Sequence, residues 1–207
     1  VIDIKVGNGA LIKTKESAER LSSLLIKIGT YYQKEVRTVI SNMDRPLGHN
    51  IGNKLEVIEA LDVLKGNAKG ELLDLSLKLA SEMVSLGKEI SEKKAREEVV
   101  ENLENGKALN KFLEFVKYQH GNIDKLEVDA KVYNIKANKN GILKDINALA
   151  IAKLSEKLGA GRKDKDDKID YNAGIVIKKE IGDKIKEGDI LASLYTNIDN
   201  KEFNLER

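Results

Sequence analysis

The sequence lacks cysteine and tryptophan altogether, and aromatic residues make up only 4% of it. The absence of cysteine excludes a disulfide framework, thiol catalysis and thiolate metal sites, and it favours a reducing compartment, so we expect a cytoplasmic protein. Few rings are available to stack on bases, and 36 Lys and Arg residues balance 34 Asp and Glu residues, so we expect no nucleic-acid partner. No apolar run approaches the roughly 20 residues that span a bilayer, so we expect no membrane partner.

A strand, a helix and a second strand are predicted near the start of the chain. Residues 1–5 and 36–40 are rich in apolar, β-branched side chains typical of strands. Between them, apolar residues recur at helical spacing from residue 18 to residue 28, after the candidate N-cap Thr14 and until Gly29, where we expect the helix to stop. This order of elements predicts two neighbouring parallel strands joined by a crossover helix.

A cluster of helices is predicted after the only proline, Pro46. Apolar residues recur there with the helical period in four segments, and such stripes are packing faces. We therefore predict that residues 1–123 form an α/β part with parallel strands and a helical cluster. The four stripes are Leu55, Ile58, Leu61 and Leu64; Leu72, Leu75, Leu79, Met83 and Leu86; Ala95, Val99 and Leu103; and Leu109, Phe112 and Val116.

The sequence pattern changes near Gly121. Short apolar or alternating runs, one short helical segment and two Gly-Asp turns follow, and this combination is typical of a small β structure. We predict that residues 126–207 form a small α+β C-terminal domain with a twisted, barrel-like β structure. Its predicted strands are 131–135, 173–178 and 190–195, and its predicted helix is 146–158.

The chain opens directly in a strand of the buried type. A parallel strand this short cannot form a sheet edge alone, and parallel sheets are normally covered on both faces. We therefore expect the chain to be the C-terminal part of a larger protein, in which sequence before Val1 supplies neighbouring strands.

Two glycines, Gly7 and Gly9, follow the first strand and allow the backbone to approach a ligand or another segment closely. The third glycine of a dinucleotide fingerprint and the Gly-Lys-Ser/Thr of a P-loop are missing, which disfavours both nucleotide-binding motifs. Lys5 stands at the carboxyl end of the strand, where open α/β sheets bind ligands. Alternatively, Lys5 pairs with Asp3 or with a neighbouring loop, and the residues alone leave both interpretations open.

The loop 43–53 after the second predicted strand carries a proline, two glycines and amide side chains. Its carbonyl groups could point at one spot, and Glu59 in the following helix could reach back to the same spot. Carbonyl oxygens with one carboxylate suit a hard, weakly charged cation better than zinc. The default alternative is a hydrogen-bonded loop that starts a helix. His49 and His120, the only histidines, have no carboxylate at an obvious spacing, so we expect neither to be catalytic.

Three separated motifs, in this order, resemble the thymidine and pyrimidine-nucleoside phosphorylase family over nearly the whole chain. The motifs are Asp3-x-Lys5-x-Gly7-x-Gly9-Ala10-x-x-Lys13; Ser41-x-Met43-x-x-Pro46-Leu47-Gly48-x-x-x-Gly52-Asn53-x-Leu55-Glu56-Val57-x-Glu59-Ala60; and Leu158-Gly159-Ala160-Gly161-Arg162-x-x-Lys165-x-Asp167-x-Ile169-Asp170.

The resemblance implies phosphorolysis, in which phosphate, the co-substrate, attacks the anomeric carbon of a pyrimidine nucleoside and releases the base. It also implies a homodimer for the full-length protein. It places the phosphate-binding and base-binding groups before Val1 and therefore assigns no catalytic residue to this chain. The fragment alone is accordingly predicted to be inactive. It places Lys5, Gly7, Gly9 and Leu11 in one wall of the substrate cleft. Leu11 stands at a usually aromatic position that lines the pyrimidine pocket.

The resemblance also implies a potassium ion. Leu47 and Asn50 would bind it through their backbone carbonyls and Glu59 through its carboxylate, with further ligands from the preceding part of the protein. Within the family, the alternatives are a strict thymidine phosphorylase or a nucleotide phosphorylase. From another class, the chain could be a non-catalytic binding or scaffold module that keeps the fold. A biotinyl or lipoyl carrier is disfavoured, because no hairpin with a modifiable lysine motif occurs.

Overall fold

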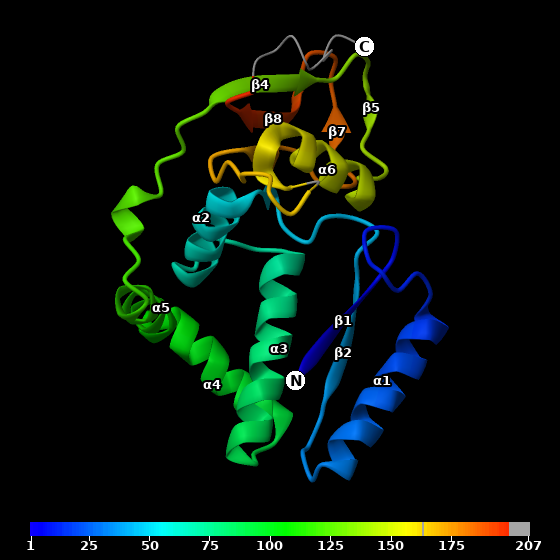
Figure 1. Cartoon of the computed structure of the whole chain (residues 1–207), viewed down its shortest axis with the longest axis vertical. Coiled ribbons are helices and arrows are strands. Elements are labelled where there is room, and N and C mark those ends of the chain that lie inside the picture. Colours follow the sequence, from blue (N-terminus) through cyan, green and yellow to red (C-terminus); the bar gives the residue numbers. More distant parts are fainter. Residues whose placement is uncertain (163, 199–207) are drawn as a thin grey trace. The chain divides into compact units, whose positions relative to one another are not determined.

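The computed structural model describes residues 1–162 and 164–198 and shows a mixed α/β structure (Figure 1). Residue 163 and residues 199–207, which include the end of the predicted second domain, lie outside the described part. No helix within the described part is long and apolar enough to cross a membrane.

The chain divides into two compact units. The first contains residues 1–47 and 60–123, and the second contains residues 48–59 and the described residues from 124 onward. The short segment 48–59 therefore belongs with the C-terminal part of the chain, although more than sixty residues separate the two in sequence.

The first unit contains a sheet of two strands, β1 (Ile2–Val6) and β2 (Thr38–Asn42). The strands run parallel, which confirms the predicted pairing. β2 begins later than predicted because the side chain of Val36 packs against Gly29 instead of lying on a strand face. A β-carbon added to Gly29 would lie only 2.3 Å from Val36 Cγ2.

Helix α1 (Lys15–Tyr31) connects the two strands. Thr14 is its N-cap, as predicted, because the Ser17 N–H donates to Thr14 Oγ1 with an N···O distance of 3.3 Å. The prediction that Gly29 ends the helix is wrong. Gly29 is buried inside the helix, where the absence of a side chain leaves room for the residues that lead into β2. This glycine therefore allows close packing and does not end the helix.

Helices cover both faces of β2 (Figure 1). On one face, Thr38 Oγ1 lies 2.6 Å from Ser22 Oγ of α1. Arg37, the preceding residue, donates from Nη1 to Ser85 Oγ of helix α3 (Glu71–Lys88), at 2.9 Å. Because neighbouring side chains of an extended chain point to opposite faces, α1 and α3 lie on opposite sides of the strand.

The four predicted helical segments after Pro46 are confirmed. α3 ends at Lys88 and is followed by its C-cap Glu89, which has a left-handed conformation. The N-cap of the next helix is Ser91, whose Oγ accepts from the Lys94 N–H at 3.3 Å. A sharp turn of this kind allows the two helices to pack against each other. Besides α3, the helices are α2 (Asn53–Leu64), α4 (Glu92–Glu104) and α5 (Lys107–Tyr118).

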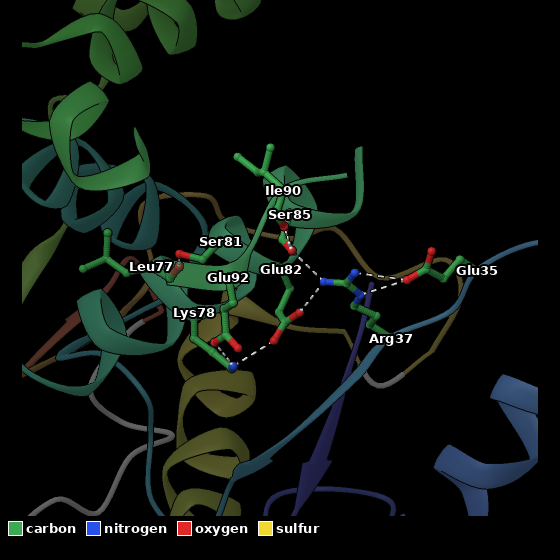
Figure 2. Close-up of polar contacts among 9 residues, drawn as sticks. All are labelled: Glu35, Arg37, Leu77, Lys78, Ser81, Glu82, Ser85, Ile90 and Glu92. Carbon is green, nitrogen blue, oxygen red and sulfur yellow. Dashed lines mark hydrogen bonds and ion pairs between the residues drawn. The ribbon is translucent and has the colours of Figure 1, made fainter. Parts of the chain in front are cut away.

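A chain of ion pairs fastens the start of β2 to α3 and α4 (Figure 2). Arg37 Nη2 lies 3.1 Å from Glu35 Oε1 and its Nη1 lies 3.2 Å from Glu82 Oε2. Lys78 Nζ lies 2.8 Å from Glu82 Oε1 and also contacts Glu92. Hydrogen bonds from Lys78 and then Arg37 lower the pKa of Glu82, and hydrogen bonds to Glu82 and Glu92 raise the pKa of Lys78. The attachment therefore depends on an ionised Glu82.

The second unit contains an open, four-stranded antiparallel sheet with the strand order β3-β6-β8-β4. A separate pair of two-residue strands, β5 and β7, lies outside it. The predicted barrel-like structure is wrong for the described residues, because β5 and β7 pair with each other and do not join the edge strands, so the sheet does not close. The strands are β3 (Asn50–Ile51), β4 (Lys131–Lys136), β5 (Gly141–Ile142), β6 (Gly174–Ile177), β7 (Lys184–Ile185) and β8 (Ile190–Thr196).

The core of the second unit lies between this sheet and α6 (Ala148–Ser155). Asn147 caps α6 by accepting from the Ala150 N–H at 2.9 Å, and the wider, π-type turn Glu156–Ala160 continues it. The predicted helix is therefore confirmed with a later start. A short 3-10 helix, Ile123–Lys125, stands where the two units meet in the sequence. The buried core residues are Leu158, Ile175, Ile177 and Leu194.

Candidate functional site

Three polar side chains meet at the carboxyl end of the parallel strands in the first unit. Lys5 Nζ lies 2.6 Å from Asp3 Oδ2 and donates to Ser41 Oγ at 3.0 Å. Ser41 Oγ in turn donates to Asp3 Oδ1 at 2.6 Å. Lys5 lies opposite Ser41 in the parallel register, and the alternation of side chains puts Asp3 on the same face. The pairing of Lys5 with Asp3, one of the two alternatives, is thus present, and the Lys5 side chain is still 32% exposed.

The loop after β1 is fastened to the turn after β2. Met43 N–H donates to the Val6 carbonyl at 2.6 Å, and Gly9 N–H donates to the Met43 carbonyl at 2.9 Å. Asp44 Oδ1 accepts from the Asn8 N–H at 2.8 Å. Two loops distant in sequence therefore form one connected surface at the carboxyl end of the sheet, the end at which open α/β sheets bind ligands.

Gly7 permits this close contact because it has no side chain. A β-carbon there would lie 2.5 Å from Asp44 Oδ1 and 2.6 Å from its backbone nitrogen, and the φ angle of Gly7 is +133°, a region that favours glycine. The predicted close backbone approach is therefore present, toward another segment of the protein. A larger residue at position 7 would separate the two loops.

Leu11 stands at the exposed tip of the same loop. Gly7 N–H donates to the Ile12 carbonyl at 3.1 Å, which closes the loop below Leu11. The side chain of Leu11 is 99% exposed, and Gly9 is exposed as well. The four residues predicted for the cleft wall, Lys5, Gly7, Gly9 and Leu11, thus lie on one strand end and the loop that follows it. An exposed leucine held on a closed loop offers an apolar contact to a ligand.

Glu59, predicted to bind a cation, points back to the segment that leads into β3. Its Oε1 accepts from the His49 N–H at 2.7 Å, and its Oε2 accepts from the Asn50 N–H at 3.1 Å. The Glu59 side chain is only 14% exposed. A β-carbon on Gly48 would lie 2.3 Å from Glu59 Oε2, so a side chain at position 48 would displace the Glu59 carboxylate. The structure thus brings Glu59 and Asn50 together through backbone N–H groups, as in a hydrogen-bonded loop that starts a helix.

Asn50 connects the segment held by Glu59 with strand β6. Asn50 lies opposite Val176 in the antiparallel ladder, and the neighbouring His49 carbonyl accepts from the Ile177 N–H at 2.8 Å. The position of the Asn50 carbonyl relative to Glu59 stays a prediction. Each Glu59 oxygen keeps a second lone pair beside its N–H donor. Carboxylate oxygens are hard ligands, and a cation bound at Glu59 stays a prediction.

Leu47, the third predicted cation ligand, directly precedes Gly48 in the sequence but belongs to the first unit. The approach of its carbonyl to Glu59 therefore stays a prediction. No cluster of three or more histidine, aspartate or glutamate side chains able to hold a metal ion occurs in residues 1–162 and 164–198. A site built on Glu59 would thus consist of one carboxylate with backbone carbonyls, a ligand set that does not suit a transition metal.

His49 lies between two carboxylates, contrary to expectation. Its Nδ1 is 3.6 Å from Glu59 Oε1 and its Nε2 is 3.4 Å from Glu180 Oε1. The sequence interpretation missed both partners, because the turn into α2 brings Glu59 back and the β3–β6 pairing brings in the residues that follow β6. The two-residue strand β3 was itself missed, since it is too short to show alternation.

Ser41 and Asp44 contact the residues predicted for the cleft wall, although the sequence analysis gave neither a role there. Ser41 could have been found from the parallel strand pairing, had the register been known, because it lies opposite Lys5. Asp44 gave a weaker signal, a carboxylate in a turn that follows a strand. Its contact with Asn8 depends on how two loops fold against each other.

The chain is similar to known proteins of one family. Residues 142–206 match the pyrimidine nucleoside phosphorylase C-terminal domain. The chain is 41% identical to a pyrimidine-nucleoside phosphorylase of Bacillus subtilis and 39% identical to one of Staphylococcus haemolyticus, and each alignment covers 97% of this chain and 48% of the relative. It is 37% identical to a thymidine phosphorylase of Metamycoplasma hominis, over 95% of this chain and 75% of that protein.

The chain thus spans about half the length of the two pyrimidine-nucleoside phosphorylases it matches, and three quarters of the Metamycoplasma relative. The alignment with the Bacillus relative covers nearly the whole chain. This chain belongs to the thymidine and pyrimidine-nucleoside phosphorylase family.

Proposed function

We propose that the protein that contains this chain catalyses phosphorolysis of pyrimidine nucleosides. Phosphate attacks the anomeric carbon, the bond to the base breaks, and the products are the free pyrimidine and a ribose or deoxyribose 1-phosphate. Relatives named pyrimidine-nucleoside and thymidine phosphorylase support this proposal. The single observation that carries it within the structure is the connected loop surface at the carboxyl end of β1 and β2, where we expect a wall of the cleft from the family resemblance.

We propose that Lys5, Gly7, Gly9 and Leu11 form that wall. The reaction needs a clamp for a doubly negative phosphate, donors to the leaving base, and exclusion of water. Of the four residues only Lys5 carries a charge, and Asp3 already balances it at 2.6 Å. The wall therefore contributes shape and apolar contact, with Leu11 against the pyrimidine. The groups that stabilise charge in the transition state come from the part of the protein that this chain does not contain.

We further propose that the Asn50 carbonyl, the Glu59 carboxylate and the Leu47 carbonyl help to bind a potassium ion. When bound, the ion would supply a positive charge that holds these oxygens together. Support comes from the low exposure of Glu59 and from its closeness to Asn50. If the proposal is right, activity in potassium salts exceeds activity in tetramethylammonium salts at equal ionic strength, and Glu59→Gln weakens the potassium dependence. Equal rates in both salts would contradict it.

The test of the activity is release of thymine or uracil from thymidine or uridine in the presence of phosphate. The protein encoded by the complete gene should release base only when phosphate is supplied, whereas purified residues 1–207 should release none. The ratio of the rates with uridine, thymidine and the corresponding nucleotides separates a broad phosphorylase from a strict thymidine phosphorylase or a nucleotide phosphorylase. An inactive complete protein would favour a non-catalytic scaffold that keeps the fold, and turnover by residues 1–207 alone would overturn the proposed division of roles.

A further inference from the structure

Asp44 holds the loop of the proposed cleft wall from the side of β2. Its Oδ1 accepts from the Asn8 N–H at 2.8 Å, and its own N–H donates to Asn42 Oδ1 at 2.8 Å. The first contact fixes the loop after β1, and the second fixes Asp44 on the last residue of β2. Asp44 is thus held on β2 through its backbone and on the loop after β1 through its carboxylate.

Backbone contacts on both sides of Asp44 complete this fastening. Gly9 N–H donates to the Met43 carbonyl at 2.9 Å, and Lys13 Nζ donates to the Asn8 carbonyl at 2.9 Å. Gly7 lies so close to Asp44 that a β-carbon would overlap its carboxylate. These contacts surround Asn8, so the backbone that leads from Lys5 to Leu11 is tied at successive points.

Asp44 is exposed and belongs to no apolar core, so packing does not explain its position. Its carboxylate accepts a hydrogen bond from Asn8, in the loop that carries Gly9 and Leu11. We infer that Asp44 is a positioning residue for phosphorolysis, which keeps this loop in place before the substrate arrives. This inference rests on the proposed function. A reacting group held in one geometry loses less freedom on the way to the transition state, and a displacement of about 1 Å can cost a hundredfold in rate.

The loop requires the oxygen atom of residue 44 that accepts from the Asn8 N–H, and it does not require the negative charge. Asp44→Asn keeps an oxygen that can accept from the Asn8 N–H, whereas Asp44→Ala removes it. In the complete protein, Asp44→Ala should lower kcat/KM by about tenfold. Asp44→Asn should stay within about twofold of the wild type, which is the rescue expected from a neutral amide. The matched control is Asp62→Ala, an exposed aspartate of α2 in the same unit.

Hydrogen exchange of the backbone amides gives a readout that does not depend on activity. Asp44→Ala should speed exchange at Asn8 and Gly9, whereas the midpoint of thermal unfolding should change by less than about 2 °C, because the residue is exposed. Asp44→Asn and Asp62→Ala should leave the exchange at these amides unchanged.

The outcomes separate this inference from the proposed function. If the complete wild-type protein releases no base from any nucleoside, the proposed function fails, while the exchange measurement still reports whether Asp44 fastens the loop. If the wild type is active and Asp44→Ala keeps full activity, or if Asp44→Asn is as impaired as Asp44→Ala, the inference is overturned. Loss of activity with faster exchange in Asp44→Ala alone supports it.

Discussion

In the second unit, four apolar side chains are buried together on the sheet and the turn after α6, whereas in the first unit the buried residues are spread over separate elements. The first unit relies instead on directed polar contacts. Arg37 and Lys78 are each held between two carboxylates, and Lys5 lies between Asp3 and Ser41. The comparison shows two ways to fix a fold, one by burial and one by paired charges.

The difference matters for function because the proposed cleft wall lies in the unit that relies on polar contacts. Hydrogen bonds fix direction as well as distance, so they can hold a loop such as 7–13 in one orientation while leaving Leu11 exposed. Apolar packing, in contrast, could hold Leu11 in place only by burying its side chain. We therefore expect the two units to respond differently to core truncation, backbone crowding and pH.

The largest effect is expected from truncation in the core of the second unit. Leu194 is fully buried, so Leu194→Ala should lower the free energy of unfolding by about 2–5 kcal/mol through lost burial and a cavity. Leu149→Ala on α6, where the side chain is 41% exposed, should cost less than about 1 kcal/mol. Urea unfolding followed by circular dichroism measures both. Similar losses for the two variants would contradict a stability based on this core.

A backbone substitution in the segment 48–59 should come next in size. Gly52 has a φ angle of +130°, and a β-carbon there would lie 2.4 Å from the Ala173 carbonyl oxygen, so Gly52→Ala should cost about 1–3 kcal/mol. Gly188→Ala is the matched control, because its φ of +86° is also positive but nothing lies within 4 Å of the added carbon. If Gly52→Ala unfolds at the same urea concentration as the control, the close contact with Ala173 does not hold this segment in the second unit.

Periodic elements could be predicted from the sequence, and contacts that depend on pairing could not. The stripes of the helices and the two parallel strands were visible because each uses a pattern within a few neighbouring residues. The cap at Thr14 was visible for the same reason. Strand β3 has only two residues, too few for alternation, so its pairing with β6 had no local signal.

The same distinction applies to the candidate site. The glycines of the wall were visible as residue types, and Glu59 as a carboxylate one turn and a half into a helix. The contact between Asp44 and Asn8 joins residues 36 positions apart, and the pairing of His49 with Glu180 follows from a strand that was not predicted. At Gly29 the error had the opposite form. A local rule predicted the end of a helix, whereas the glycine lies inside α1 and allows the close approach of Val36.

The stability of the first unit should depend on pH through the ion pairs of Glu82. Lys78 and then Arg37 lower the pKa of Glu82, so its stabilising effect is present above the ordinary carboxyl pKa of about 4.3 and is lost as the pH falls through the lowered value. Glu82→Gln should therefore cost about 1–2 kcal/mol at pH 7, a value discounted because Lys78 is partly exposed. The cost should decrease progressively as the pH falls below about 4.3. Glu97→Gln, an exposed change on α4, is the control. A cost for Glu82→Gln that is the same at pH 7 and pH 3.5 would contradict the role of charge.

The smallest expected effect is a gain in stability, at Gly87 near the end of α3. Gly87 lies in the helix without a positive φ, it is exposed, and nothing lies within 4 Å of an added β-carbon. Alanine loses less backbone freedom on folding than glycine, so Gly87→Ala should raise the free energy of unfolding by about 0.5–1 kcal/mol. Gly29→Ala in α1 is the informative counterpart, because its β-carbon would meet Val36 at 2.3 Å and the same substitution should destabilise the unit. Circular dichroism melts of both variants decide the point. A loss of stability in Gly87→Ala would contradict the open space that the structure shows around position 87.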